Sequence, residues 1–306
     1  MLIEFIEENK LDQNFINTAN NYFIPLAESL VEKQKLHLDK VTANKHSSHS
    51  KESKTFFVGI NGCQGSGKST LVAFLAEYLK QNYQLSVAVL SLDDFYLSKA
   101  ERNVLADSVH ALFKTRGVPG THDVTLLTKT LNDLKRNQKL NISLPRFNKA
   151  QDDPFPKKYW PEMQTPVDMV LFEGWCWGIP AQPSNDLILP VNSLESKQDQ
   201  QLIWRSKVIE VLRTDYQPLY QLMDTWIMLK APNFSCVYQW RLEQEHKLAQ
   251  NLDGKGRDNV MSDEQVANFI QYYQRLTEYG IKVLPNNVEL LFELDEQRRV
   301  IASRGL

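Results

Sequence analysis

A glycine-rich segment, "GINGCQGSGKST" (residues 59–70), contains the residue types that bind a phosphate. Its spacing, Gly62-x-x-x-x-Gly67-Lys68-Ser69, matches the P-loop pattern GxxxxGK[ST]. In that pattern backbone N–H groups and the start of the next helix face the phosphates, the lysine reaches their oxygens, and the hydroxyl offers a ligand to Mg²⁺. The segment therefore predicts a site for a nucleoside triphosphate and Mg²⁺. The residues expected to bind the nucleotide are Gly62, Cys63, Gln64, Gly65, Ser66, Gly67, Lys68, Ser69 and Thr70.

Acidic residues follow two apolar runs farther along the chain. "VLSLDDFYLS" contains Asp93 and Asp94, and "MVLFEGW" contains Glu173. A P-loop enzyme needs a carboxylate near the metal and a group that handles the proton of the acceptor. Because side chains alternate along a strand, we expect the two aspartates to point different ways, one to the cleft and one in a supporting role. The alternative interpretations are a helix cap or a turn for the aspartates and a satisfied strand-end acid for Glu173.

Apolar strands alternating with helices must position these residues. Strands are expected at residues 55–60, 86–92, 167–172 and 225–230, and a helix at residues 71–80. Near-continuous apolar strands separated by helices favour a parallel sheet that is covered on both faces. The predicted fold class is α/β, a P-loop-type three-layer α/β/α arrangement with a mostly parallel sheet, a helical N-terminal extension and a helical lid.

The segments on either side of this sheet have patterns of their own. Residues 1–40 have helical spacing and residues 41–54 form a polar linker, which predicts an N-terminal extension (1–54) followed by the P-loop domain (55–306). Residues 174–224 are too long for a simple connection and include apolar positions typical of a helix. Ser262 and Gln265 form a capping box at the start of another helix.

Composition limits the classes of partner. The 306 residues have a net charge of −2 and a pI near 6.3, so no broad basic surface is expected for nucleic acid or an anionic membrane. A small anionic substrate needs only a local basic site. Three widely spaced cysteines form no disulfide framework, which favours a reducing cytoplasm. The acidic N-terminus and the short apolar runs predict neither a signal peptide nor a membrane span.

A signalling GTPase is the nearest rival architecture for the P-loop. It would need an Asn-Lys-x-Asp motif after a later strand to bind guanine. The match in this chain, residues 9–12, precedes the P-loop in a charged, helix-like stretch. The base is therefore expected to be adenine, and the predicted cofactors are ATP and Mg²⁺.

Seven segments occur in an order that resembles one family of kinases. They are "GSGKST", "LDDFYLS", "RGVPGTHD", "PRFNKA", "LFEGWCWG", "VYQWRLEQE" and "MSDEQVANFIQYY". Together they resemble the plant-type D-glycerate 3-kinases and their bacterial and fungal kinase-like relatives, a group close to phosphoribulokinase, uridine kinase and pantothenate kinase. The resemblance extends from about residue 55 to the C-terminus.

The resemblance implies roles for individual residues. Lys68, Asp93 and Arg241 are expected to be catalytic, with Asp93 taking the proton of the acceptor hydroxyl and Arg241 acting from a helical lid. Mg²⁺ is expected at Ser69, Asp93 and Glu173. The acceptor is expected to contact Asp94, Tyr96, Arg116, His122, Asp123 and Arg146, and Lys149 falls in the same block as Arg146. A guanidinium such as Arg116 suits a carboxylate, whereas a turn capped by Asp123 and a surface ion pair for Arg146 are the plainer interpretations.

Two departures from the family pattern affect the lid and the acceptor site. The loop "NLDGKGRDNVMSDE" is longer than in the relatives, which leaves open whether Arg241, Lys255 or Arg257 contacts the phosphates. "FNKAQDDPFPKKYWP" replaces the usual glycine- and arginine-bearing stretch, so the acceptor is less well defined than the kinase chemistry.

The leading hypothesis is an ATP-dependent kinase that phosphorylates a hydroxyl of a small organic acid, D-glycerate giving 3-phosphoglycerate. It would act as a monomer or homodimer in the cytoplasm, without nucleic acid or membrane partners. One alternative is a nucleoside or pantothenate-type kinase. Another is a nucleotide-binding regulatory or assembly ATPase that uses residues 174–224 as a partner surface, with Trp175, Trp177 and Trp204 as anchors.

Overall fold

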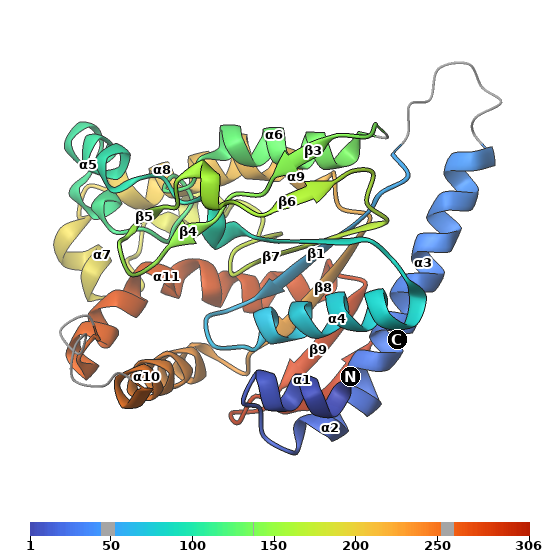
Figure 1. Ribbon diagram of the computed structural model, residues 1–306. Helices are drawn as coiled ribbons and strands as arrows, with labels where there is room; N and C mark the ends of the chain where they lie inside the picture. Colours follow the sequence, from blue (N-terminus) through green and yellow to red (C-terminus); the bar gives the residue numbers. More distant parts are fainter. Residues whose placement is uncertain (44–52, 137, 252–259) are drawn as a thin grey trace.

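A six-stranded sheet lies at the centre of the computed structural model, which describes residues 1–43, 53–136, 138–251 and 260–306 (Figure 1). The strand order is β10-β9-β8-β1-β7-β2, and every neighbouring pair is parallel except β9 with β10. The strands are β1 (Phe56–Gly62), β2 (Val87–Ser91), β7 (Met169–Gly174), β8 (Thr225–Lys230), β9 (Leu290–Leu294) and β10 (Val300–Arg304). The predicted mostly parallel α/β sheet is confirmed.

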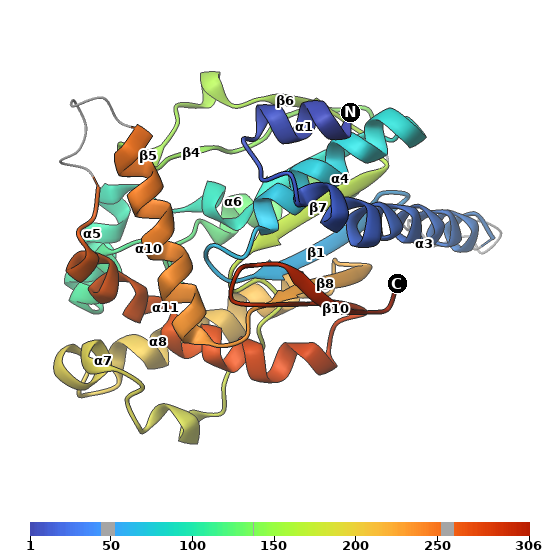
Figure 2. The same ribbon diagram turned by 90° about the horizontal axis from the view of Figure 1, so that it is seen from below.

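Helices cover both faces of this sheet. Figure 2 shows α4 on one side and α11 on the other. Every residue of β1 and of β7 is buried, as expected for central parallel strands. The helices are α1 (Leu2–Glu8), α2 (Phe15–Thr18), α3 (Ile24–Ala43), α4 (Lys68–Tyr83), α5 (Lys99–Ser108), α6 (Val124–Lys135), α7 (Ser193–Gln198), α8 (Ile203–Val211), α9 (Gln217–Tyr220), α10 (Phe234–Asn251) and α11 (Asp263–Val283).

The N-terminal helices pack on α4 and share its core. The ring of Phe5 meets the ring of Phe74 edge-on at 5.5 Å, and Phe23 lies 6.0 Å from Phe74 and 6.5 Å from Phe292. The predicted helical extension therefore packs beside α4 and reaches strand β9 of the sheet, through the rings of Phe23 and Phe292. The linker begins later than expected, because α3 continues to Ala43, and residues 44–52 of it lie outside the described residues.

Two small antiparallel pairs, which the sequence did not predict, lie between α6 and β7. One joins β3 (Asn141–Ser143) to β6 (Glu162–Gln164), and the other joins β4 (Phe147–Asn148) to β5 (Asp153–Pro154). Their strands are only two or three residues long, too short for a clear alternating pattern. They matter because β4 immediately precedes Lys149.

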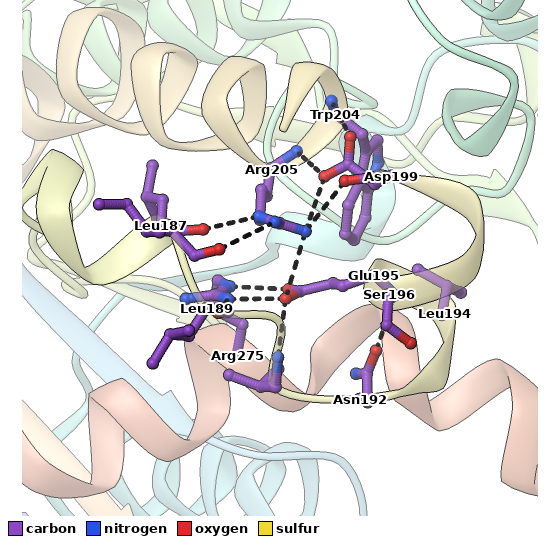
Figure 3. A network of polar contacts seen from close by, with 12 residues as sticks. Leu187, Leu189, Asn192, Leu194, Glu195, Ser196, Asp199, Trp204, Arg205 and Arg275 are labelled. Carbon is purple, nitrogen blue, oxygen red and sulfur yellow. Dashed lines mark hydrogen bonds and ion pairs between the residues drawn. The ribbon is translucent and has the colours of Figure 1, made fainter. Parts of the chain in front are cut away.

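A buried network of four charged side chains fastens residues 186–205 to α11 (Figure 3). Arg275 of α11 donates two hydrogen bonds to Glu195, at 2.7 and 2.6 Å, and Arg205 lies 3.3 Å from Asp199 and 3.7 Å from Glu195. All four residues are buried. Two positive and two negative groups are thus balanced inside the protein, which fixes the position of α11.

The long segment after β7 is helical, as predicted, but it offers no tryptophan anchors. Trp175, Trp177 and Trp204 are all buried in the core. These three side chains therefore do not form exposed anchors for a partner: Trp175 borders the cavity beside the P-loop, and Trp177 and Trp204 belong to the core.

The described part of the chain contains no helix that is both long and apolar enough to cross a bilayer. Cys63, Cys176 and Cys236 are unpaired and buried.

Candidate active site

The P-loop connects the end of β1 to the start of α4. Gly65 and Gly67 have φ angles of 76° and 88°, in the region that favours glycine. A Cβ on Gly65 would also lie 2.6 Å from Cβ of Trp240, a residue of α10. The loop is therefore held closely against α10, and it places the N-terminus of α4 where a phosphate can bind.

Glu173, at the end of β7, meets the first residues of α4. Its Oε1 accepts a hydrogen bond of 3.0 Å from the Ser69 hydroxyl, and its Oε2 lies 3.8 Å from Nζ of Lys68. Glu173 is buried, and Oε2 accepts no hydrogen bond from the described residues. A buried carboxylate oxygen beside a hydroxyl fits Mg²⁺, which usually takes one or two protein ligands together with substrate phosphates. Ser69 and Glu173 are thus placed to hold the predicted metal.

Asp93 lies in a 3₁₀ turn, Leu92–Phe95, that follows β2 directly. Its Oδ1 accepts a hydrogen bond of 3.0 Å from the Tyr96 hydroxyl, and its Oδ2 accepts one of 2.7 Å from Nζ of Lys149. Burial favours the neutral acid, but Lys149 and then Lys68 outweigh it and hold the pKa of Asp93 well below its usual range. Asp93 is therefore ionised at neutral pH.

Asp94 points away from Asp93 and supports the segment around β4. Its Oδ1 accepts a hydrogen bond of 3.2 Å from the Phe147 backbone N–H, and its Oδ2 lies 3.4 Å from Arg146. Burial raises the pKa of Asp94 to about 6, although Arg146 opposes the shift. The two aspartates do diverge as expected, although they do so in a 3₁₀ turn rather than along a strand.

Tyr96 is packed between two rings. Its own ring stacks on His122, and the ring of Phe147 meets it edge-on at 5.3 Å. His122 is buried behind it, with Nδ1 joined to the Tyr216 hydroxyl by a hydrogen bond of 2.6 Å. Burial lowers the pKa of His122 to about 3, so this imidazole is neutral.

Arg116 is tied to its surroundings through both its side chain and its backbone. It forms an ion pair with Asp152, and its guanidinium lies over the ring of Phe147, 5.5 Å from the centroid. The Arg116 carbonyl accepts a hydrogen bond of 3.3 Å from the Tyr273 hydroxyl. Asp152 is also held by the buried Arg102 at 2.8 Å, so its charge is shared by two cations.

Arg241 projects from α10 and is held by residues of the same helix and of α11. It forms an ion pair with Glu245, donates a hydrogen bond of 3.3 Å to Gln244, and lies 5.7 Å from the ring centroid of Phe269. Glu245 is buried and also accepts a hydrogen bond of 3.1 Å from the Met261 backbone N–H. Lys255 and Arg257, the other two candidate lid cations, lie outside the described residues.

These groups surround one cavity of about 220 Å³ at the carboxyl ends of β1, β2 and β7. It brings together nine residues expected from the sequence to act on nucleotide, metal or acceptor: Lys68, Ser69, Asp93, Tyr96, Arg116 and Arg241, and also Gln64, Gly65 and Glu173. Lys149 lines it too. Four cations and two carboxylates thus face the space beside the P-loop.

Several other residues predicted to contact the acceptor lie outside this lining. Asp123 caps α6, where its side chain accepts a hydrogen bond of 2.8 Å from Leu126 N–H. His122 lies behind Tyr96, and Arg146 lies with Asp94. Among the nucleotide-binding positions, Cys63 is buried, and burial raises the pKa of its thiol to about 12.

Four lining residues were not among the site residues predicted from the sequence: Trp175, Gln244, Phe269 and Tyr273. Phe269 and Tyr273 lie one turn apart on α11, where their spacing indicated an ordinary apolar helix face. The aromatic composition of that face was the available signal, and it does not by itself separate a cavity wall from a core.

A P-loop between a buried parallel strand and a helix, with carboxylates after two neighbouring strands, defines a nucleotide-binding α/β protein of the P-loop class. The sequence profile of the Phosphoribulokinase / Uridine kinase family matches residues 57–181, and the chain belongs to this family. Its membership supports an ATP-dependent phosphotransferase that acts on a small molecule, and P-loop kinases generally use ATP with Mg²⁺.

Similar proteins include named kinases. An uncharacterized kinase of Schizosaccharomyces pombe, mug58, is 35% identical over 78% of this chain and 86% of its own length. The chloroplastic D-glycerate 3-kinase of Arabidopsis thaliana is 32% identical over 80% of this chain, which spans 53% of the plant protein. A solved D-glycerate 3-kinase from Cryptococcus neoformans shares the fold with a TM-score of 0.68 and 26% identity, over 90% of this chain and 98% of that one.

Proposed function

We propose that this protein transfers the γ-phosphoryl group of ATP to a hydroxyl of a small organic acid, and that the acid is D-glycerate, phosphorylated at O3. The observation that carries the proposal is the cavity, where the P-loop and Asp93 share about 220 Å³ with Arg116 and Lys149. Two basic side chains on the acceptor side favour an anionic acceptor. The printed names of the plant and Cryptococcus relatives support glycerate as that acid.

The residues divide the reaction between them. Lys68 and the N-terminus of α4 bind the phosphates, and Ser69 and Glu173 are placed to hold Mg²⁺, which when bound would neutralise charge on the phosphate oxygens. The acceptor oxygen forms a bond to the γ-phosphorus while the bond from that phosphorus to ADP breaks, and the acceptor proton passes to Asp93. Arg241 faces the same cavity and would offset charge in the transition state.

The size of the cavity argues against a bulky acceptor. The acceptor would share about 220 Å³ with the phosphate end of ATP, so a compact acid suits this space better than a nucleoside. A nucleoside or pantothenate-type kinase is the remaining alternative within the same class of enzyme.

A coupled assay of ADP release tests the assignment directly. D-Glycerate, uridine, pantothenate and ribulose 5-phosphate are supplied in turn with ATP and Mg²⁺, and stimulation by D-glycerate above the other three is expected. Stimulation by uridine or pantothenate alone would contradict the assignment of D-glycerate as the acceptor and would leave the assignment as a kinase intact. ATP hydrolysis that no acceptor stimulates would instead favour a regulatory ATPase.

A further inference from the structure

The two carboxylate oxygens of Asp93 are held in different ways. Oδ1 is bound by Tyr96, which is only 5% exposed and is fixed between His122 and Phe147. Oδ2 is bound by Lys149, whose side chain is 61% exposed. One oxygen therefore has a rigid partner, and the other has a flexible lysine that faces solvent and the cavity.

The hydrogen bond from Lys149 hinders the proposed role of Asp93 as the group that accepts the proton of the acceptor hydroxyl. A hydroxyl that is to pass its proton to Oδ2 competes with an ammonium group that already donates to that oxygen at 2.7 Å. The competition ends if Lys149 moves. Asp93 would stay in place, because Tyr96 continues to hold Oδ1.

Lys149 can leave Asp93 with little loss of packing. Its stem is largely exposed, and an ammonium has three donors that can turn toward a new acceptor. Arg116 is more restricted, because it is paired with Asp152, stacked on Phe147 and held by its carbonyl to Tyr273. Of these two cations near Asp93, Lys149 is the one free to follow a ligand.

We infer that Lys149 is the receptor for the carboxylate of the acceptor, and that its transfer from Asp93 to that carboxylate exposes Oδ2 to the acceptor hydroxyl. The inference rests on the proposed function, since it takes the acceptor to be a hydroxy acid. It adds a mechanism of substrate specificity. The carboxylate of an acid draws Lys149 away from Asp93, so that Oδ2 can accept the proton of the acid's hydroxyl. A neutral polyol or water leaves Lys149 bound to Asp93. The acid is thus selected in the catalytic step as well as in binding.

The test compares Lys149→Met with the wild-type protein on D-glycerate, on glycerol and without an acceptor. Loss of a hydrogen bond to a charged group predicts that kcat/KM for D-glycerate falls about 10- to 100-fold. The rate of turnover with glycerol should stay the same or rise, and the rate of ATP hydrolysis without acceptor should rise. Both follow because Lys149 no longer occupies Oδ2 of Asp93 in this variant. Lys158→Met, an exposed lysine of the neighbouring turn that does not line the cavity, is the matched control and should leave all three rates unchanged.

Two kinetic outcomes would overturn the inference. An equal loss with D-glycerate and glycerol would show that Lys149 only supports Asp93, and unchanged rates with both acceptors would place the carboxylate elsewhere. Calorimetric titration of D-glycerate into the protein distinguishes failure of the Lys149 inference from failure of the proposed function. Binding without turnover in the wild type, weakened by Lys149→Met, rejects glycerate phosphorylation and keeps Lys149 as the carboxylate receptor; absence of binding rejects both.

Discussion

The ring of Tyr96 stacks on the imidazole of His122, with centroids 4.4 Å apart and 26° between the planes. The two residues also pair as an isolated antiparallel bridge of the backbone. Since Tyr96 donates to Asp93, this contact connects the segment 116–123 to the carboxylate of the cavity. His122 is therefore linked to Asp93 through Tyr96 and does not line the cavity.

Burial of His122 predicts a pH dependence of stability. Its pKa is lowered from 6.5 to about 3, so below pH 6.5 the unfolded chain takes up a proton that the folded protein does not. Stability is therefore lost as the pH falls, by about 2 kcal/mol between pH 7 and pH 5. Urea unfolding at several pH values, for the wild type and His122→Asn, measures this.

The comparison of the two proteins isolates the imidazole. Asp94, with a pKa raised to about 6, contributes the opposite slope between pH 4 and 6, but it does so in both proteins. His122→Asn should be less stable at pH 7 and lose less stability on acidification. If the stability of the two proteins depended on pH in the same way, His122 would take up its proton in the folded protein at the same pH as in the unfolded chain.

Lys68 supplies the cation nearest to Glu173 and the start of α4. Lys68→Ala should lower kcat by about 10²–10³, the effect of removing one preorganised charge donor, while the thermal unfolding midpoint changes little. Turnover close to that of the wild type would contradict the assignment of this loop to the phosphates.

Asp93 and Asp94 are adjacent in sequence but should respond differently to amide substitution. Asp93→Asn removes the proton acceptor and should lower kcat by about 10²–10⁴. Asp94→Asn keeps an oxygen for the Phe147 N–H and should lower kcat far less. Steady-state kinetics with saturating ATP measure both, and a larger effect at Asp94 would reverse the assignment.

The sequence predicted the sheet and the nucleotide side of the site better than the acceptor side. Long apolar strands and the P-loop depend on local patterns, so β8 was located to the residue. Tyr273 depends on how α11 crosses the cavity, and Lys149 depends on a pair of two-residue strands. Such contacts arise from packing between distant segments, which one sequence does not reveal. Asp123 shows the converse: its plainer interpretation was a capping residue in a turn, and in the structure it caps α6.

The buried charge network predicts a large effect on stability from one substitution. Arg275→Met leaves Glu195 buried with Arg205 as its remaining ionic partner, at 3.7 Å, and should cost about 3–5 kcal/mol in the free energy of unfolding. Arg299→Met is the matched control, because it removes an exposed arginine that pairs with Asp295 at the surface and should cost at most about 1 kcal/mol.

The double variant Glu195→Met/Arg275→Met shows where that cost comes from. If an uncompensated buried charge is the cause, removing both partners should restore part of the lost stability. Recovery should be incomplete, because Arg275 also donates to the carbonyls of Asp186 and Leu189. No recovery would mean that the hydrogen bonds lost with the two side chains, from Arg275 to these carbonyls and from the Val191 N–H to Glu195, outweigh the uncompensated charge. Phe269 and Tyr273 of α11 line the cavity. If KM for D-glycerate rises across these variants in step with their loss of stability, the charge network also positions the cavity wall.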